Sequence, residues 1–226
     1  MTGLSETINN EEIRRIYGEN TRTYEMILRI YKILGVRLSK WRAQAFEHLP
    51  VLSNPRILDV ACGTGANFDY LTEKYPDFQE IVGIDYTPQM LARAKKRINE
   101  NDWDGINLKL IDAKKMTSVL KGKFDLVVST YSLSIIPNSP VVLKEINKIL
   151  RDKGFVMLLD CQKFEGFLRI FNPIAIFLSK KLGGNEETYS VPVREIASEI
   201  FNPIHGRLLY SGLFYECVFR KRSSRK

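Results

Sequence analysis

The chain has 226 residues, 44% of them hydrophobic and 27% charged, a composition typical of one globular domain with a single substantial core. No stretch reaches the roughly 18 uninterrupted apolar residues of a membrane-spanning helix, and the polar, acidic residues 1–12 do not resemble a secretion signal. The three cysteines are too few for a disulfide framework and have no metal-ligand spacing. They favour a reducing, cytoplasmic setting.

The net charge of +8 is concentrated in two segments. Residues 220–226 form a basic tail, and residues 22–42 carry six basic side chains against one acid, Glu25. Such charge indicates an anionic partner, which is a membrane surface, a nucleic acid or an acidic ligand. A solvated tail that only aids solubility explains the charge of residues 220–226 equally well.

The first 50 residues are predicted to be helical. Asn9 and Glu12 have the spacing of a capping box, which begins a short helix ending near Gly18. A longer helix is predicted over residues 21–34, and a third over residues 38–49. These helices precede the first strand.

A glycine loop follows that strand. The apolar residues 56–58 lead into Asp59, and a helical pattern starts at Phe68. Gly63 and Gly65 permit conformations and close approaches that a side chain would prevent. A strand, a glycine loop and a helix in this order bring backbone N–H groups to a ligand, although dinucleotide enzymes share the pattern.

Three further strands end in polar residues. Residues 81–85 end in Asp85, which falls 20 residues after Gly65, the spacing expected of a carboxylate that binds ribose hydroxyls. Residues 108–112 end in Asp112, and residues 124–131 end beside Ser129 and Thr130. Alternation of such strands with helices predicts a mostly parallel sheet.

The remaining elements follow the same alternation at first. Thr87 and Ser139 each precede a proline and begin helices, predicted over residues 88–99 and 139–150. Gly154 is expected to mark a break before a strand at residues 155–159. An aromatic and basic insert covers residues 161–191, a helix covers 193–200, and strands at 207–210 and 213–220 form a hairpin.

The four strand ends together resemble those of the class I S-adenosylmethionine-dependent methyltransferases. The resemblance covers residues 56–160. It implies an α/β Rossmann-like fold with a mostly parallel seven-stranded sheet, an antiparallel C-terminal hairpin, helices on both faces and an N-terminal helical lid. One domain is expected, with the lid at residues 1–50, the cofactor-binding core at 51–160, the insert at 161–191, and the terminal helix, hairpin and tail at 192–226.

The resemblance also implies the cofactor, S-adenosylmethionine, and its contacts. The loop amides and Thr64 would meet the carboxylate, the main-chain oxygens of Ala61 and Ser129 the ammonium, and Asp85 the ribose. Asp59 would orient the loop or reach the amino group, and Thr130 would open into the site. The residues expected to bind the cofactor are Asp59, Ala61, Gly63, Thr64, Gly65, Asp85, Tyr86, Met90, Asp112, Ala113, Ser129 and Thr130.

No catalytic base stands out. His205 precedes the terminal hairpin and is a candidate base, whereas His48 lies in a predicted helix, where a packing or surface role is expected. Aromatic side chains can line an amine pocket by cation–π contact; the candidates are Tyr17, Tyr24, Tyr131 and Tyr189. No metal is expected.

Several acceptors are excluded or disfavoured. The segment 129–132 lacks the proline pair of adenine-amino methyltransferases and the cysteine of cytosine-carbon enzymes, and the paired glutamates of arginine methyltransferases are missing. A small-molecule or lipid acceptor is therefore favoured. Residues 124–133, 173–183 and 211–215 are most similar to bacterial phospholipid N-methyltransferases and their quinone C-methyltransferase relatives.

We therefore expect a phosphatidylethanolamine-type amine as the acceptor, with a quinone-precursor carbon as the alternative. The basic N-terminal helix and the insert would then contact an anionic membrane peripherally, or else form a lid over a soluble substrate. A nicotinamide-dependent dehydrogenase is disfavoured because Phe68 replaces the third glycine of its motif. A nucleic-acid-binding methyltransferase recruited by the tail is the last rival, and the oligomeric state is left open.

Overall fold

The computed structural model describes residues 35–164, 166–173, 176 and 191–223. The helices predicted for residues 9–18 and 21–34, and much of the insert expected at 161–191, lie outside the described residues. Within the described part of the chain, no helix is both long enough and apolar enough to cross a membrane.

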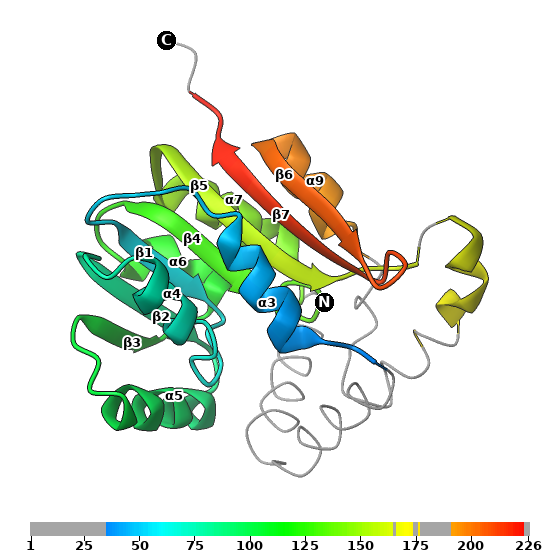
Figure 1. Ribbon diagram of the computed structural model, residues 1–226. Coiled ribbons are helices and arrows are strands. Elements are labelled where there is room, and N and C mark those ends of the chain that lie inside the picture. The colour runs from blue at the N-terminus through cyan, green and yellow to red at the C-terminus, as the bar shows by residue number, and fades with distance from the viewer. Residues whose placement is uncertain (1–34, 165, 174–175, 177–190, 224–226) are drawn as a thin grey trace, which may run out of the picture.

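Seven strands in the described residues form one sheet with the order β3-β2-β1-β4-β5-β7-β6 (Figure 1). Strands β1 to β5 run parallel, and β7 is antiparallel to both β5 and β6. The predicted parallel sheet with a terminal antiparallel hairpin is therefore confirmed. The bounds are β1 Arg56–Val60, β2 Glu80–Asp85, β3 Ile106–Leu110, β4 Phe124–Thr130, β5 Leu150–Cys161, β6 Phe201–Leu209 and β7 Phe214–Lys221.

Helices cover both faces of this sheet, as predicted. The bounds are α3 Leu38–Glu47, α4 Phe68–Lys74, α5 Pro88–Glu100, η2 Ala113–Lys115, α6 Met116–Val119, α7 Ser139–Ile149, η3 Gly166–Phe171 and α9 Val193–Ile200. Helices α3, α4 and α5 pack into one core cluster through Phe46, Phe68 and Ile98. Helices α7 and α9 pack into the cluster on the other face through Ile146 and Ala197.

Strand β5 is longer than its sequence pattern predicts. It begins at Leu150 rather than Phe155, because Leu150 already pairs with Phe124. The next pair joins Leu126 to Phe155, so the residues between them on β5 bulge out of the ladder. Gly154, which was expected to mark a break, lies inside this bulge, where an added Cβ would come within 2.9 Å of the Leu150 side chain.

Strand β6 also begins earlier than predicted, at Phe201 rather than Arg207. Phe201 pairs with Lys221 across the hairpin, and the register shifts between Pro203 and His205. A proline is tolerated here because β6 is an edge strand with one free side. Pairing with β7 therefore extends the strand through residues that have no strand periodicity of their own.

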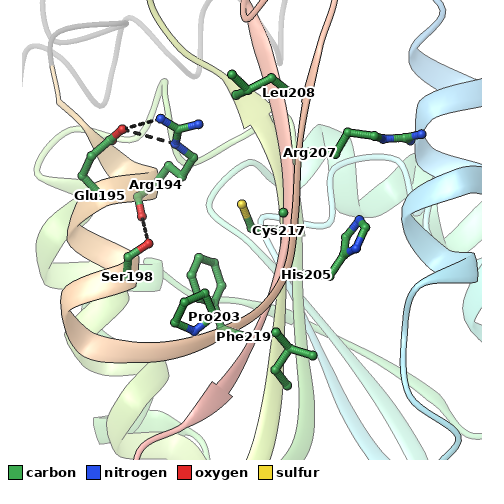
Figure 2. A pocket seen from close by; sticks show the side chains of 11 residues that line it. Arg194, Glu195, Ser198, Pro203, His205, Arg207, Leu208, Cys217 and Phe219 are labelled. Atoms are coloured by element: carbon green, nitrogen blue, oxygen red, sulfur yellow. Dashed lines mark hydrogen bonds and ion pairs between the residues drawn. The ribbon is translucent and has the colours of Figure 1, made fainter.

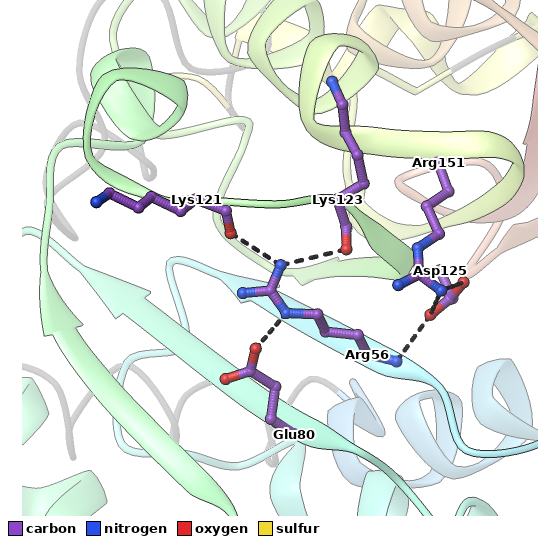
Figure 3. Close-up of polar contacts among 6 residues, drawn as sticks. All are labelled: Arg56, Glu80, Lys121, Lys123, Asp125 and Arg151. Carbon is purple, nitrogen blue, oxygen red and sulfur yellow. Dashed lines mark hydrogen bonds and ion pairs between the residues drawn. The ribbon is translucent and has the colours of Figure 1, made fainter.

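A polar network joins the amino ends of three neighbouring strands (Figure 3). The Arg56 guanidinium of β1 pairs with Glu80 of β2 and donates to the carbonyl oxygens of Lys121 and Lys123, which precede β4. The Arg56 amide donates to Asp125 of β4 at 2.9 Å. These contacts hold the amino edge of the sheet together, and the glycine loop lies at the opposite, carboxyl edge.

Candidate active site

The glycine loop after β1 is a tight turn with a positive backbone φ at Ala61 (55°), Gly63 (55°) and Gly65 (75°). Within it, the Gly65 amide donates to the Cys62 carbonyl at 2.9 Å. A Cβ on Gly65 would lie 2.6 Å from the Phe68 ring, whereas one on Gly63 would meet no atom within 4 Å. Gly65 is therefore needed for packing, and Gly63 leaves open space in front of the loop.

This loop stands where the strand order reverses, between β1 and β4. The last pair between these strands is Asp59 with Val128, so Ser129 and Thr130 continue beyond this pairing and pair only with β5. In open α/β sheets, ligands bind in the crevice outside the carboxyl ends of the strands at such a switch point. The structure thus brings the predicted loop residues and the end of β4 together at this switch point, and this region is called the crevice.

Asp59 lies at the base of this crevice and is fully buried. One carboxylate oxygen accepts a hydrogen bond from the Asn67 side-chain amide at 2.9 Å, and Asn67 in turn accepts one from the Thr130 hydroxyl at 3.0 Å. The second oxygen, Oδ2, is buried without a partner among the described residues. Burial raises the pKa of Asp59 to about 7, although Asn67 and Arg42 oppose the shift.

Arg42 enters the crevice from α3, and sequence reasoning missed it. Its Nη2 donates to the Thr130 hydroxyl at 3.5 Å, and its guanidinium carbon lies 5.1 Å from the centre of the Tyr131 ring. The position carried a signal, because Arg42 interrupts an apolar stripe on α3 that includes Leu38 and Phe46 at steps of four residues. A cation on the buried face of a helix indicates a polar partner in the fold.

Tyr131, one of the predicted aromatic candidates, joins the end of β4 to α3. Its hydroxyl donates to the Leu38 carbonyl at 2.9 Å, and its backbone has a positive φ of 55°. Burial raises the pKa of this hydroxyl above its usual value. The structure therefore shows Tyr131 as a phenol that holds α3 against the crevice. The other three tyrosine candidates, Tyr17, Tyr24 and Tyr189, lie outside the described residues.

Asp85 lies at the tip of β2, as predicted, and is 9% exposed. Its two oxygens accept backbone hydrogen bonds, one from Gly63 at 2.9 Å and one from Thr87 at 2.8 Å. Burial raises its pKa, and both backbone bonds oppose that shift. The Thr87 side chain and the Tyr86 amide also hydrogen-bond this carboxylate, so Asp85 orders the glycine loop and the turn before α5, and a ribose hydroxyl would share these acceptor oxygens.

The residues predicted near the adenine lie at the next strand ends and in the first turn of α5. Asp112 caps η2 by accepting a hydrogen bond from the Lys114 amide at 2.9 Å. Ala113 and Met90 are buried, at 7% and 5% exposed, and Tyr86 is half-buried. Thr64, predicted at the cofactor carboxylate, is likewise half-buried within the glycine loop.

Asp160, at the end of β5, fixes the segment after β4. It is 1% exposed and accepts hydrogen bonds from the Ser132 and Ser134 amides, both at 3.1 Å, and from the Ser134 hydroxyl at 2.6 Å. Burial raises its pKa against these bonds. Ser129 shares a hydrogen bond with Ser132 at 2.7 Å. Sequence reasoning did not find this anchor, because it depends on contacts between two distant strands.

His205, the predicted candidate base, lies within β6 rather than at the crevice. Its imidazole is 3.1 Å from Glu216 and stacks on His48, with ring centres 3.9 Å apart. His205 also lines a cavity of about 570 Å³ between α9 and β6 (Figure 2). Strands β5 and β7 separate this cavity from β4, so it is distinct from the glycine-loop crevice.

The sheet order and the crevice have the architecture of the class I S-adenosylmethionine-dependent methyltransferases. The donors and acceptors of the crevice suit that cofactor, because Asp59 offers a free buried oxygen, Gly63 leaves room for close approach, and Asp85 places a buried carboxylate at the tip of β2. More specifically, residues 52–189, over half of the chain, match the family described as "Methyltransferase domain". The chain belongs to this family.

Relatives and solved structures agree with this assignment. A demethylmenaquinone methyltransferase of Staphylococcus aureus is 28% identical over 154 residues, which cover 67% of this chain and 61% of that protein. The aligned part thus spans about three fifths of the relative. Among solved structures, an O-methyltransferase family protein from Burkholderia thailandensis has a TM-score of 0.66 at 16% identity, covering 84% of this chain and 57% of that one.

A second solved structure is the N-methyltransferase NodS from Bradyrhizobium japonicum in complex with S-adenosyl-L-homocysteine. It has a TM-score of 0.59 at 16% identity and covers 82% of this chain and 86% of its own. At this level of identity the two solved structures support the fold and leave the acceptor open.

Proposed function

We propose that the protein transfers the methyl group of S-adenosylmethionine to a ring carbon of a quinone-type acceptor. The observation that carries the methyl-transfer part is the crevice between β1 and β4, with the unpartnered Oδ2 of buried Asp59 at its base. The quinone acceptor is supported by the 28% identity to demethylmenaquinone methyltransferase over 67% of the chain. This reverses the order of acceptors that the sequence alone favoured.

In this proposal the amino group of the cofactor meets Asp59 Oδ2 and the carbonyl oxygens of Ala61 and Ser129. The charge-assisted hydrogen bond to Asp59 is stronger than one between neutral groups. The carboxylate of the cofactor meets the amides of residues 63–65, and Arg42, beside Thr130, adds a positive charge to the crevice. Asp85 accepts from the ribose hydroxyls, and the pair Asp112–Ala113, with Tyr86 and Met90, surrounds the adenine.

When bound, the cofactor supplies a methyl carbon that its sulfonium has already activated for in-line displacement. The protein therefore has to align the acceptor and exclude water. Tyr131 and the segment that Asp160 anchors stand at the end of β4, beside the crevice. A carbon acceptor must also lose a proton. His205, which the sequence offered as that base, lies on β6 outside the crevice; its role stays a prediction, which a loss of kcat in His205→Gln with a quinone acceptor would support.

A phospholipid amine is the second candidate acceptor, and one surface favours it. Helix η3 follows β5 beyond the carboxyl edge of the sheet (Figure 1). It exposes Phe167 (81%), Ile170 (60%) and Phe171 (45%) beside Arg169. Exposed aromatic side chains next to basic ones are typical of segments that bind the interface of an anionic membrane. With a net charge of +8, this surface supports peripheral membrane contact.

Product analysis tests both acceptors in one experiment. The full chain is incubated with methyl-labelled S-adenosylmethionine and, separately, with a demethylated quinone, with phosphatidylethanolamine vesicles and with a total lipid extract. Label on a quinone ring carbon supports the first proposal, and label on the amine nitrogen supports the second. Asp85→Ala serves as the matched control, since it removes a cofactor contact. Equal label transfer by this variant would contradict the proposed crevice.

A further inference from the structure

The only two histidines of the chain meet on the same side of the sheet. His48 follows α3, and His205 lies on β6, yet their rings stack with centres 3.9 Å apart and planes inclined by 18°. Figure 2 shows the His205 ring on the opposite side of the hairpin from Cys217. The two imidazoles therefore meet on the other face of the hairpin from α9, although His205 is one of the residues that line the cavity there.

A buried carboxylate completes the cluster. Glu216 of β7 has a side chain that is 1% exposed, and its Oε1 lies 2.6 Å from His48 Nδ1 and 3.1 Å from His205 Nε2. The three ligand atoms all lie within 4.8 Å of one another. Among the described residues, no other group of histidine, cysteine and acidic side chains gathers this closely.

The other oxygen of Glu216 is already held. Arg207 Nη2 donates to Oε2 at 2.8 Å and to the Gln44 side-chain oxygen of α3 at 3.2 Å. Metal-binding carboxylates are commonly oriented by such outer hydrogen bonds. Arg207 thereby presents Oε1 to the two imidazoles, whose side chains are 34% (His48) and 30% (His205) exposed, so the cluster is open to solvent on one side.

We propose that His48, His205 and Glu216 bind one Zn²⁺ ion. Two imidazole nitrogens and one carboxylate are a known set of three protein ligands for zinc, with a water in the fourth position. A tetrahedral ion with bonds of about 2.1 Å separates its ligand atoms by about 3.4 Å. Small rotations of the two partly exposed imidazoles bring them to that spacing.

Such an ion would join α3 to the terminal hairpin. Helix α3 carries Arg42 and the Leu38 carbonyl that contacts Tyr131, so the ion would brace the helix that borders the cofactor crevice. The zinc proposal does not rest on the proposed methyl transfer, because it is argued from the contacts of His48, His205 and Glu216 alone.

The test is a titration of the metal-free, tag-free full chain with ZnCl₂. A parallel titration with MgCl₂ is the control, because Mg²⁺ prefers oxygen ligands. We expect one Zn²⁺ per chain and no response to Mg²⁺. At about 100 times the dissociation constant, Zn²⁺ should raise the Tm by about 5–10 °C. Because the chain has two histidines, both imidazole signals in an NMR spectrum should shift together at one equivalent.

His48→Gln and His205→Gln should each weaken Zn²⁺ binding at least about tenfold, whereas Cys161→Ser, which alters the least buried thiol, should bind as the wild type does. Unchanged Zn²⁺ affinity in both histidine variants, or imidazole signals that do not move in the wild type, would overturn the proposal. The cluster would then be two imidazoles that contact one carboxylate oxygen without a metal ion. The wild-type NMR titration decides the matter even if a variant does not fold.

Discussion

Two buried carboxylates, on different strands of one sheet, have opposite surroundings. Asp59 at the end of β1 has one hydrogen-bond partner and a free oxygen, and its pKa is raised to about 7. Glu216 on β7 is as deeply buried but contacts Arg207, His48 and His205. A buried charge without partners is costly. The unpartnered oxygen of Asp59 is therefore an acceptor in the crevice for a hydrogen bond from a ligand.

Asp59→Asn should separate function from stability most strongly. The amide that this substitution introduces would keep the hydrogen bond from Asn67 but would carry no charge. At pH 8 the free energy of unfolding should therefore rise, by at most about 4 kcal/mol, which is the free energy that corresponds to the raised pKa of Asp59. Affinity for S-adenosylhomocysteine should fall about 10- to 100-fold, because a charge-assisted hydrogen bond is lost. Calorimetry measures the affinity for S-adenosylhomocysteine and thermal unfolding measures the stability, with Asp152→Asn, at an exposed side chain, as the control.

The pH dependence of cofactor binding should sharpen the same point. The folded-state pKa of Asp59 is raised from 3.8 to about 7, so the free protein holds a proton there that the cofactor amino group displaces. Affinity for S-adenosylhomocysteine should therefore fall about tenfold per pH unit below 7. Asp59→Asn should lack this slope, and a wild-type profile that is flat between pH 5 and about 7 would contradict the assigned role.

The same titration has the opposite effect on the stability of the ligand-free protein. Only the folded state keeps the proton between pH 3.8 and about 7, so the contribution of Asp59 to stability is lost as the pH rises through that window. The difference between wild type and Asp59→Asn in denaturant unfolding isolates this contribution from those of other acids.

Glu216→Gln should have the reverse effect on stability. The neutral amide leaves Arg207 without its charged partner, so the free energy of unfolding should fall by about 1–3 kcal/mol. Affinity for S-adenosylhomocysteine should change less than about twofold, since Glu216 lies outside the crevice. Denaturant unfolding of Glu216→Gln and Asp59→Asn at pH 8 shows whether each substitution raises or lowers the free energy of unfolding. A gain in stability for Glu216→Gln would contradict the proposed difference between the two acids.

Arg42→Met should have the smallest effect of these substitutions when each is expressed as a free energy. It removes a half-buried positive charge beside Thr130 while keeping much of the apolar stem, so affinity for S-adenosylhomocysteine should fall about fivefold. Arg42→Lys should restore part of the loss if charge is what matters. Equal affinities for wild type and Arg42→Met would assign Arg42 to packing α3 alone.

Local sequence patterns determined the fold and much of the crevice. The strand before Asp59, the glycine turn and the acids at the next two strand ends are all readable along a short stretch of chain, because strand periodicity and turn residues act locally. The same locality explains why β5 and β6 were predicted too short. Their first residues are held by pairing with Phe124 and with β7 rather than by their own pattern.

Only the tertiary structure decided the partners of the buried polar groups. Arg42 reaches Thr130, Asp160 holds the segment after β4, and the two histidines meet at Glu216 across long separations in sequence. The contacts of α3 arise because this helix packs against the sheet that includes the hairpin. The sequence periodicity of either segment does not predict which residues of the other it will contact. The residue types that can serve a ligand were thus visible in the chain, but packing selected which of them lie together.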